Sequence, residues 1–264
     1  MRNTAGIRPP NSYDVIADIY DTDMGQNIPF GDIGYYVARA RERPQQILEL
    51  GCGTGRITLP LLEAGLAVTA ADVSAPMLSA LRQKLAGAPA LPETSSLHLV
   101  QMEIRQWALD GRFSTILCPY SLFTYLVESS EQREFLQQVR SQLKGDGHFI
   151  LDLFLPNGTI QYGKPTWDYR RALGNGRLLE RWKLIEPGPA PQVNLIRRHY
   201  RILTESGDTL RAFSTVDRIR YSYPEQMRAL LGKSGFDVVA ADWDYGTSPS
   251  QATARFVTFR CRAR

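Results

Sequence analysis

Short apolar runs recur along the first 155 residues, and segments with apolar residues at helical spacing separate them. The runs lie at residues 47–50, 67–72, 97–100, 113–118 and 148–153. Because these runs have few polar positions, they are typical of strands that are buried on both faces. Strands that alternate with helices predict a parallel sheet with helices on both of its faces.

The pattern changes after residue 155, where no further alternation of strand and helix is seen. Three strand-like runs follow an irregular segment at 156–176, and they lie at 178–185, 193–203 and 210–221. These runs predict an antiparallel insertion. A helix and two more strands then complete the chain, at 224–235, 236–240 and 254–259.

Together the elements predict a doubly wound α/β fold. Its mostly parallel, seven-stranded sheet has helices on both faces, and an antiparallel β insertion precedes the last helix. At the N-terminus, Tyr13, Ile16 and Ile19 have the spacing of an amphipathic helix. The expected domains are an N-terminal helical lid (1–44), a ligand-binding α/β domain (45–155 and 222–264) and the insertion (156–221), which would cap the substrate or an oligomer contact.

Composition narrows the class of protein. The chain has 264 residues, 43% of them hydrophobic, and a net charge of +4, with no block of like charge that would indicate a nucleic-acid partner. Cys52, Cys118 and Cys261 form no CxxC pair, which argues against a disulfide framework and a zinc site, so no metal is expected. No run approaches the roughly 18 apolar residues of a membrane span, and a cytoplasmic protein is expected.

A glycine-rich turn follows the run at 47–50. Gly51, Gly53 and Gly55 occupy alternate positions, and Arg56 stands where a dinucleotide site would have its third glycine. No Gly-Lys-Ser/Thr follows, so the turn is not a Walker A loop. Asp72 ends the next run, where its carboxylate can accept hydrogen bonds from two ribose hydroxyl groups. The pattern therefore predicts a nucleoside ligand.

The strings at residues 49–55 (ELGCGTG), 71–74 (ADVS) and 113–120 resemble the successive motifs of class I S-adenosylmethionine-dependent methyltransferases of the small-molecule type. The resemblance implies that S-adenosylmethionine is the cofactor and S-adenosylhomocysteine the product. It also implies that Gly51 and Gly53 pass beside the methionine part, that Glu49 helps to hold the amino group, and that Asp72 binds the ribose.

The same resemblance implies an adenine site. Met102 and Glu103 stand where the family usually has Gly-Asp, and Glu103 would accept a hydrogen bond from the adenine amino group. Ile104 and Met77 would pack on the two faces of the ring.

Two further segments of the resemblance concern the methyl group. Cys118, Pro119 and Tyr120 match the segment that passes near the sulfonium, and residues 13–21 are similar to a lid whose tyrosine, here Tyr13, touches the methionine end of the cofactor.

The implied reaction is the in-line transfer of a methyl group to an N or O nucleophile of a small molecule, such as a secondary metabolite. Asp152, at the carboxyl end of the run at 148–153, is the best-placed residue to take a proton, and Asp152 and Tyr120 are the candidate catalytic residues. The wall of the acceptor site is expected to be aromatic, formed with Tyr120 by Tyr125, Phe154, Trp167 and Tyr169.

Two alternatives to methylation remain at this point: another group transfer or a cyclisation with the same cofactor, and a catalytically silent binding subunit. Six arginines of the insertion bear on the choice, namely Arg197, Arg198, Arg201, Arg211, Arg218 and Arg220. Such a cluster usually forms a solvated face paired with acids. It can also bind an anionic substrate or a partner subunit, for example in a homodimer.

Overall fold

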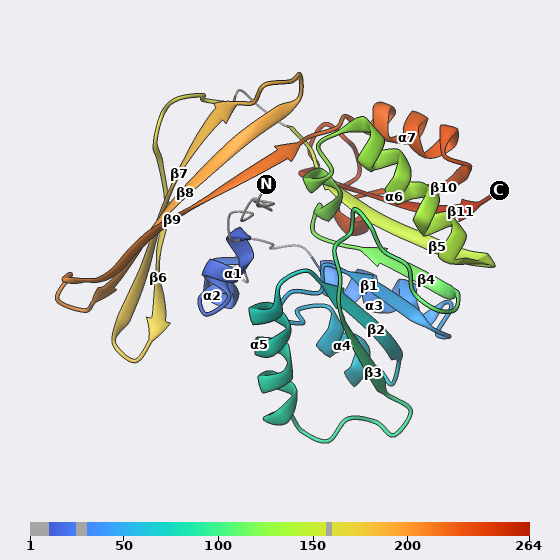
Figure 1. Cartoon of the computed structure of the whole chain (residues 1–264), viewed down its shortest axis with the longest axis horizontal. Coiled ribbons are helices and arrows are strands. Elements are labelled where there is room, and N and C mark those ends of the chain that lie inside the picture. Colours follow the sequence, from blue (N-terminus) through green and yellow to red (C-terminus); the bar gives the residue numbers. More distant parts are fainter. Residues whose placement is uncertain (1–10, 25–30, 157–159) are drawn as a thin grey trace, which may run out of the picture.

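The computed structural model describes residues 11–24, 31–156 and 160–264, which form a seven-stranded sheet and a separate four-stranded sheet (Figure 1). The strands are β1 (Ile47–Leu50), β2 (Ala67–Asp72), β3 (Ser96–Gln101), β4 (Phe113–Cys118), β5 (Leu143–Phe154), β6 (Thr166–Gly174), β7 (Arg177–Pro187), β8 (Val193–Thr204), β9 (Thr209–Arg220), β10 (Phe236–Trp243) and β11 (Phe256–Ala263). The helices are α1 (Ser12–Ile16), α2 (Tyr20–Met24), α3 (Asp32–Arg41), α4 (Thr58–Glu63), α5 (Ala75–Ala86), α6 (Ser129–Gln142) and α7 (Pro224–Lys233), with short 3₁₀ turns η1 (Leu122–Tyr125) and η2 (Asp244–Gly246).

The larger sheet has the strand order β10-β11-β5-β4-β1-β2-β3. Strands β3, β2, β1, β4 and β5 pair in parallel, and β11 runs antiparallel between β5 and β10. Every residue of β1 and β4 is buried, as expected for the apolar runs at the centre of a parallel sheet. The predicted seven-stranded, mostly parallel fold is therefore confirmed.

Helices cover both faces of this sheet. One apolar core lies between the sheet and α6 and α7, and it includes Phe135 and Met227. A second core lies between the opposite face and α3, α4 and α5, and it includes Tyr36 and Leu61. The sheet is thus shielded on both sides, and the carboxyl ends of its parallel strands form the edge where open α/β sheets bind ligands.

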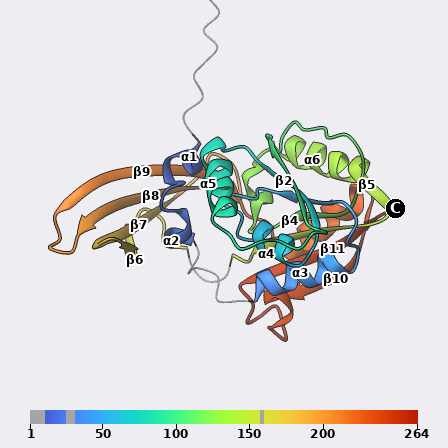
Figure 2. The same cartoon turned by 90° about the horizontal axis from the view of Figure 1, so that it is seen from below.

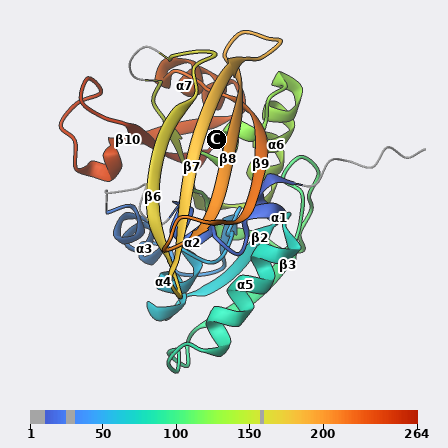
Figure 3. The same cartoon turned by 90° about the vertical axis from the view of Figure 1, so that its left-hand side faces the viewer.

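The insertion is a four-stranded antiparallel sheet in the order β6-β7-β8-β9, which stands beside the larger sheet (Figures 1 and 3). Strands β7, β8 and β9 match the three predicted runs. Strand β6 lies in the segment that was predicted to be irregular. Its pairing shifts register between Trp167 and Tyr169 and again between Ala172 and Gly174. Such bulges interrupt the alternation of polar and apolar residues by which a strand is detected in a sequence.

The N-terminal segment forms two short helices, α1 and α2, where the pattern predicted one amphipathic helix. They lie between the insertion and α5 (Figures 1 and 2). Ile16 of α1 and Ile19, which precedes α2, pack with Met77 of α5 and with Tyr169 and Leu179 of the insertion. The segment therefore bridges the two parts of the molecule. The lead-in expected at residues 1–10 lies outside the described residues.

Two absences apply to the part of the chain that the structure describes. No helix there is long and apolar enough to cross a membrane. No group of three or more His, Cys, Asp or Glu residues is arranged to hold a metal ion there. The cytoplasmic location and the homodimer stay predictions.

Candidate functional site

The glycine turn presents bare backbone at the carboxyl end of β1. Gly51 and Gly53 adopt φ angles of +68° and +55°, a region that residues with a Cβ rarely adopt. Asp72 holds the turn from the end of β2: its two oxygens accept hydrogen bonds from the N–H groups of Gly53 and Ser74, each at 2.8 Å. Asp72, which is predicted to bind the ribose, is thus held beside the exposed backbone.

Glu49 lies in β1, only 1% exposed, beneath this turn. Burial raises the pKa of its carboxyl group to about 8, although the hydroxyl of Thr58, 2.6 Å from Oε2, and the charge of Arg56 lower it. Among the described residues, Oε1 has no hydrogen-bond donor. A buried carboxyl group in this state is suited to receive the amino group of a ligand, as predicted for S-adenosylmethionine.

The apolar residues predicted for adenine belong to two different cores. Met77 is buried against the N-terminal helices, and Ile104 is buried in the core beneath α6. Met102 packs partly against the same core. Glu103 accepts a hydrogen bond from Arg105 at 2.9 Å, so its carboxylate already has a cationic partner. Its predicted contact with adenine remains a prediction.

The loop after β4 has an unusual backbone. Cys118 and Pro119 are buried, the former within the core beneath α6, whereas Tyr120 is partly exposed. Tyr120 and Ser121 both have φ of +56°. A left-handed conformation costs residues with a Cβ about 1–2 kcal/mol each, so other contacts must stabilise this turn.

Asp152 supplies those contacts. Its buried carboxylate accepts hydrogen bonds from the hydroxyl groups of Tyr36 and Tyr245, at 2.7 and 2.8 Å, and from the N–H groups of Tyr120 and Ser121. Burial raises the pKa of Asp152, and these bonds lower it. Four donors already surround this carboxylate, three at Oδ2 and one at Oδ1, so the contacts favour a positioning role over the proton transfer that the sequence suggested. Proton transfer by Asp152 stays a prediction.

Four tyrosines gather over the glycine turn. The hydroxyl oxygens of Tyr13 and Tyr125 are 2.7 Å apart, and the Tyr13 and Tyr20 rings are in edge contact. Each of these side chains, and that of Tyr120, is partly exposed, yet burial is the main cause that raises its pKa. We call the partly exposed surface that these four tyrosines form beside the glycine turn, between the N-terminal helices and the β4 loop, the hollow.

Tyr20 and Arg56 were not singled out as site residues. A Cβ at Gly53 would stand 3.7 Å from the Tyr20 ring, so Tyr20 lies against the turn. The contact of Tyr13 with the methionine end of the cofactor stays a prediction. Arg56 lies 5.4 Å from the centre of the Tyr120 ring and pairs with the buried Asp32 at 2.7 Å. The helical spacing of Tyr13 and Tyr20 in the sequence could have pointed to Tyr20, but packing between the two rings explains that spacing equally well.

The other residues predicted for the aromatic wall of the acceptor site do not lie together. Tyr169 is buried and donates a hydrogen bond to Asp23 of α2, so it anchors the N-terminal helices. Phe154 is partly buried at the end of β5. Trp167 is 57% exposed, and the bulge that follows it turns its side chain to the face opposite Tyr169. We therefore correct the prediction that Trp167 and Tyr169 share a wall.

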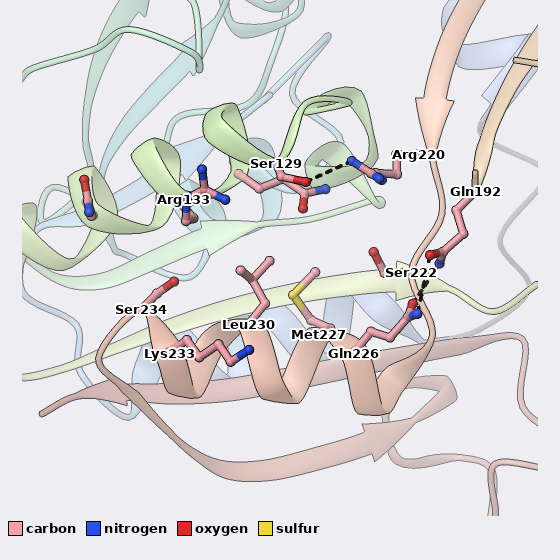
Figure 4. Close-up of a pocket in the computed structure, with 12 residues that line it drawn as sticks. Ser129, Arg133, Gln192, Arg220, Ser222, Gln226, Met227, Leu230, Lys233 and Ser234 are labelled. Carbon is pink, nitrogen blue, oxygen red and sulfur yellow. Dashed lines mark hydrogen bonds between the residues drawn. The ribbon is translucent and has the colours of Figure 1, made fainter. Parts of the chain in front are cut away.

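A cavity of about 400 Å³ lies elsewhere, between α6 and α7 (Figure 4). It is lined mainly by polar side chains, among them Arg133, Gln226 and Lys233. None of the predicted site residues lines it, and the hollow beside the glycine turn remains the candidate site.

The profile of the family "Methyltransferase domain" matches residues 47–147. The cypemycin N-terminal methyltransferase of a Streptomyces species is 24% identical over 248 residues, which cover 93% of this chain and 95% of that protein. The CcbJ methyltransferase from Streptomyces caelestis has a similar structure, with a TM-score of 0.76 at 25% identity over 96% of this chain and 97% of that chain.

A second solved structure bears on the cofactor. The glycopeptide N-methyltransferase MtfA, complexed with (S)-adenosyl-L-methionine, gives a TM-score of 0.59 at 25% identity, over 88% of this chain and 93% of that chain. The open oxygen of Glu49, the glycine turn and Asp72 fit this cofactor. The chain is a class I S-adenosylmethionine-dependent methyltransferase.

Proposed function

We propose that this methyltransferase transfers the methyl group to an amine nitrogen of a small molecule or a short peptide. The observation that carries the proposal is the likeness to an N-terminal methyltransferase over 93% of the chain, which includes the insertion as well as the cofactor-binding part. MtfA, similar over 88% of the chain, is also an N-methyltransferase.

In this proposal the site residues divide by the part of the cofactor that they meet. Glu49, Gly51 and Gly53 hold the methionine end together with Tyr20 of the lid. Asp72 binds the ribose. The adenine lies near Met77, Met102, Glu103 and Ile104. When bound, the cofactor supplies a methyl group on a positively charged sulfur.

The chain's contribution to the reaction is placement and shielding. The four tyrosines enclose the hollow beside the turn, and their raised pKa values keep the hydroxyl groups protonated near neutral pH. An uncharged amine carries its own lone pair, so attack needs no ionised base, and holding both reactants in line lowers the barrier by up to about 7–11 kcal/mol. Asp152 keeps the Tyr120–Ser121 turn in place while this occurs.

The test uses amines and matched alcohols. Purified protein and S-adenosylmethionine labelled on the methyl group are incubated with glucosamine, glucose, alanine and lactate, and products are identified by mass spectrometry. We expect N-methylated products from the amines only. Transfer to an alcohol without transfer to its matched amine would replace the proposal with O-methylation, and cofactor turnover without a labelled acceptor would contradict both.

A further inference from the structure

The six arginines that the sequence placed in one cluster have separate surroundings. Five of them contact groups away from the hollow: Arg197 pairs with Glu186, Arg201 with Glu180, Arg211 with Asp18 and Arg218 with Glu128, and Arg220 donates to the carbonyl of Val127. Arg198 is the sixth, and its position is different.

Arg198 lies on the face of the insertion that meets the N-terminal helices. It shares that face of β8 with Tyr200 and Ile202, which pack against those helices. Asp217 of the neighbouring β9 accepts a hydrogen bond from its Nη1. Arg198 therefore lies on the partly buried face of β8, whereas its neighbour Arg197 is more exposed on the opposite face.

Most donors of Arg198 are still available. A guanidinium group has five N–H bonds, and in the described part of the chain only Nη1 of Arg198 has an acceptor. By contrast, Arg181 on the same face binds two carboxylates, those of Asp23 and Asp168. About 21% of the Arg198 side chain is accessible, although Tyr13 and Tyr125 lie close enough to influence its pKa. Arg198 thus lies near two of the tyrosines that form the hollow, with donors that remain available to a ligand.

The electrostatic surroundings of the hollow agree with this position. Burial has the largest effect on the pKa of Tyr120 and raises it, and the charge of Asp23 also raises it. The charges of Arg56, Arg181 and Arg198 lower the pKa. Three arginines, Arg198 among them, therefore lie near enough to the Tyr120 hydroxyl to act on it.

We infer that the acceptor carries an anionic group, a carboxylate or a phosphate, and that Arg198 binds it while the amine reaches the methyl group. The inference rests on the proposed function. Asp217 keeps the guanidinium oriented and electrically balanced before the acceptor enters. A second carboxylate on one guanidinium is already seen at Arg181, so the arrangement has a precedent in this chain.

The variants are chosen to separate binding from folding. Arg198→Gln alone would leave Asp217 buried without its cation, which destabilises proteins. The double variant R198Q/D217N removes both charges and retains groups that can hydrogen-bond to each other. Arg197→Gln is the matched control, because Arg197 is adjacent in β8 and pairs with Glu186 on the outer face. Thermal melting of all three reports folding.

The probes are pairs of amines that differ in one negative charge: glycine and glycinamide, alanine and alaninamide, glucosamine 6-phosphate and glucosamine. Their binding to the complex with S-adenosylhomocysteine is measured by titration calorimetry, and their methylation by mass spectrometry. At least one anionic amine should bind more tightly than its neutral partner. R198Q/D217N should weaken binding of that amine on the order of 10- to 100-fold and leave binding of the neutral partner unchanged. R197Q should bind both amines as the natural chain does.

Three results would overturn the inference: neutral amines that bind as tightly as their anionic partners, a preference unchanged in R198Q/D217N, or no binding by any anionic amine. An anionic preference in calorimetry without methyl transfer would support the inference and contradict amine methylation. Methyl transfer to amines without any preference for the anionic ones would support amine methylation and contradict the inference. The experiment therefore distinguishes failure of the inference from failure of the proposed function.

Discussion

Glu49 in β1 and Asp152 in β5 are both almost completely buried at the same edge of the sheet, yet their surroundings differ. Glu49 accepts one hydrogen bond, from Thr58, and burial raises its pKa to about 8. Asp152 accepts four, two from tyrosine hydroxyl groups and two from backbone N–H groups. A carboxyl group that accepts one hydrogen bond can still serve a ligand, whereas one that already accepts four serves the fold.

The largest expected effect is on stability at Asp152. Asp152→Asn would place an amide N–H₂ among four donors, and at least one of them would lose its acceptor in the interior. We expect the free energy of unfolding in urea to fall by about 2–3 kcal/mol, since an orphaned buried group costs about 1–3 kcal/mol. Glu49→Gln should not lower it at pH 7, because Gln avoids the cost of keeping a buried carboxyl group protonated at that pH, and equal losses in the two variants would contradict the comparison.

The second effect concerns cofactor binding at Glu49. The native carboxyl group keeps its proton up to about pH 8, whereas the unfolded chain releases it near 4.5. Without cofactor, the free energy of unfolding should therefore fall as pH rises between these values. Affinity for S-adenosylmethionine should rise toward pH 8, because the ionised form binds the ammonium group.

Glu49→Gln should remove both pH dependences and weaken binding on the order of 10- to 100-fold at pH 8. Titration calorimetry and urea unfolding at several pH values measure the two. A variant that binds the cofactor as the natural chain does at pH 8 would refute the assignment of Glu49 to the amino group.

The smallest effect comes from removing a single donor in each region. Thr58→Val removes the bond that lowers the pKa of Glu49, so the pH dependence of cofactor binding should move to higher pH by up to about 1 unit. Tyr245→Phe removes one of the four donors to Asp152 and should cost about 1 kcal/mol of stability without moving that pH dependence. An identical pH profile for T58V and the natural chain would count against the role of Thr58.

Much of the candidate cofactor-binding site could be predicted because it depends on local sequence. The glycine positions, the acid at the end of β2 and the apolar runs that form parallel strands are all readable along the chain, and the structure brings Gly53 and Asp72 into direct contact. The bulge at residues 167–169 could not be predicted, because it depends on how β6 pairs with β7, and it moved Trp167 to the outer face.

The sequence by itself determined the seven-stranded fold, the glycine turn and the cofactor class, because hydrophobic periodicity and glycine spacing act over a few neighbouring residues. Only the tertiary structure decided which side chains meet across long separations. It surrounded Asp152 with donors from α3, the β4 loop and η2, placed Tyr20 over Gly53, and separated Arg198 from its five neighbours. Such contacts follow from strand register and packing between distant segments, and neither is encoded in any local stretch of the chain.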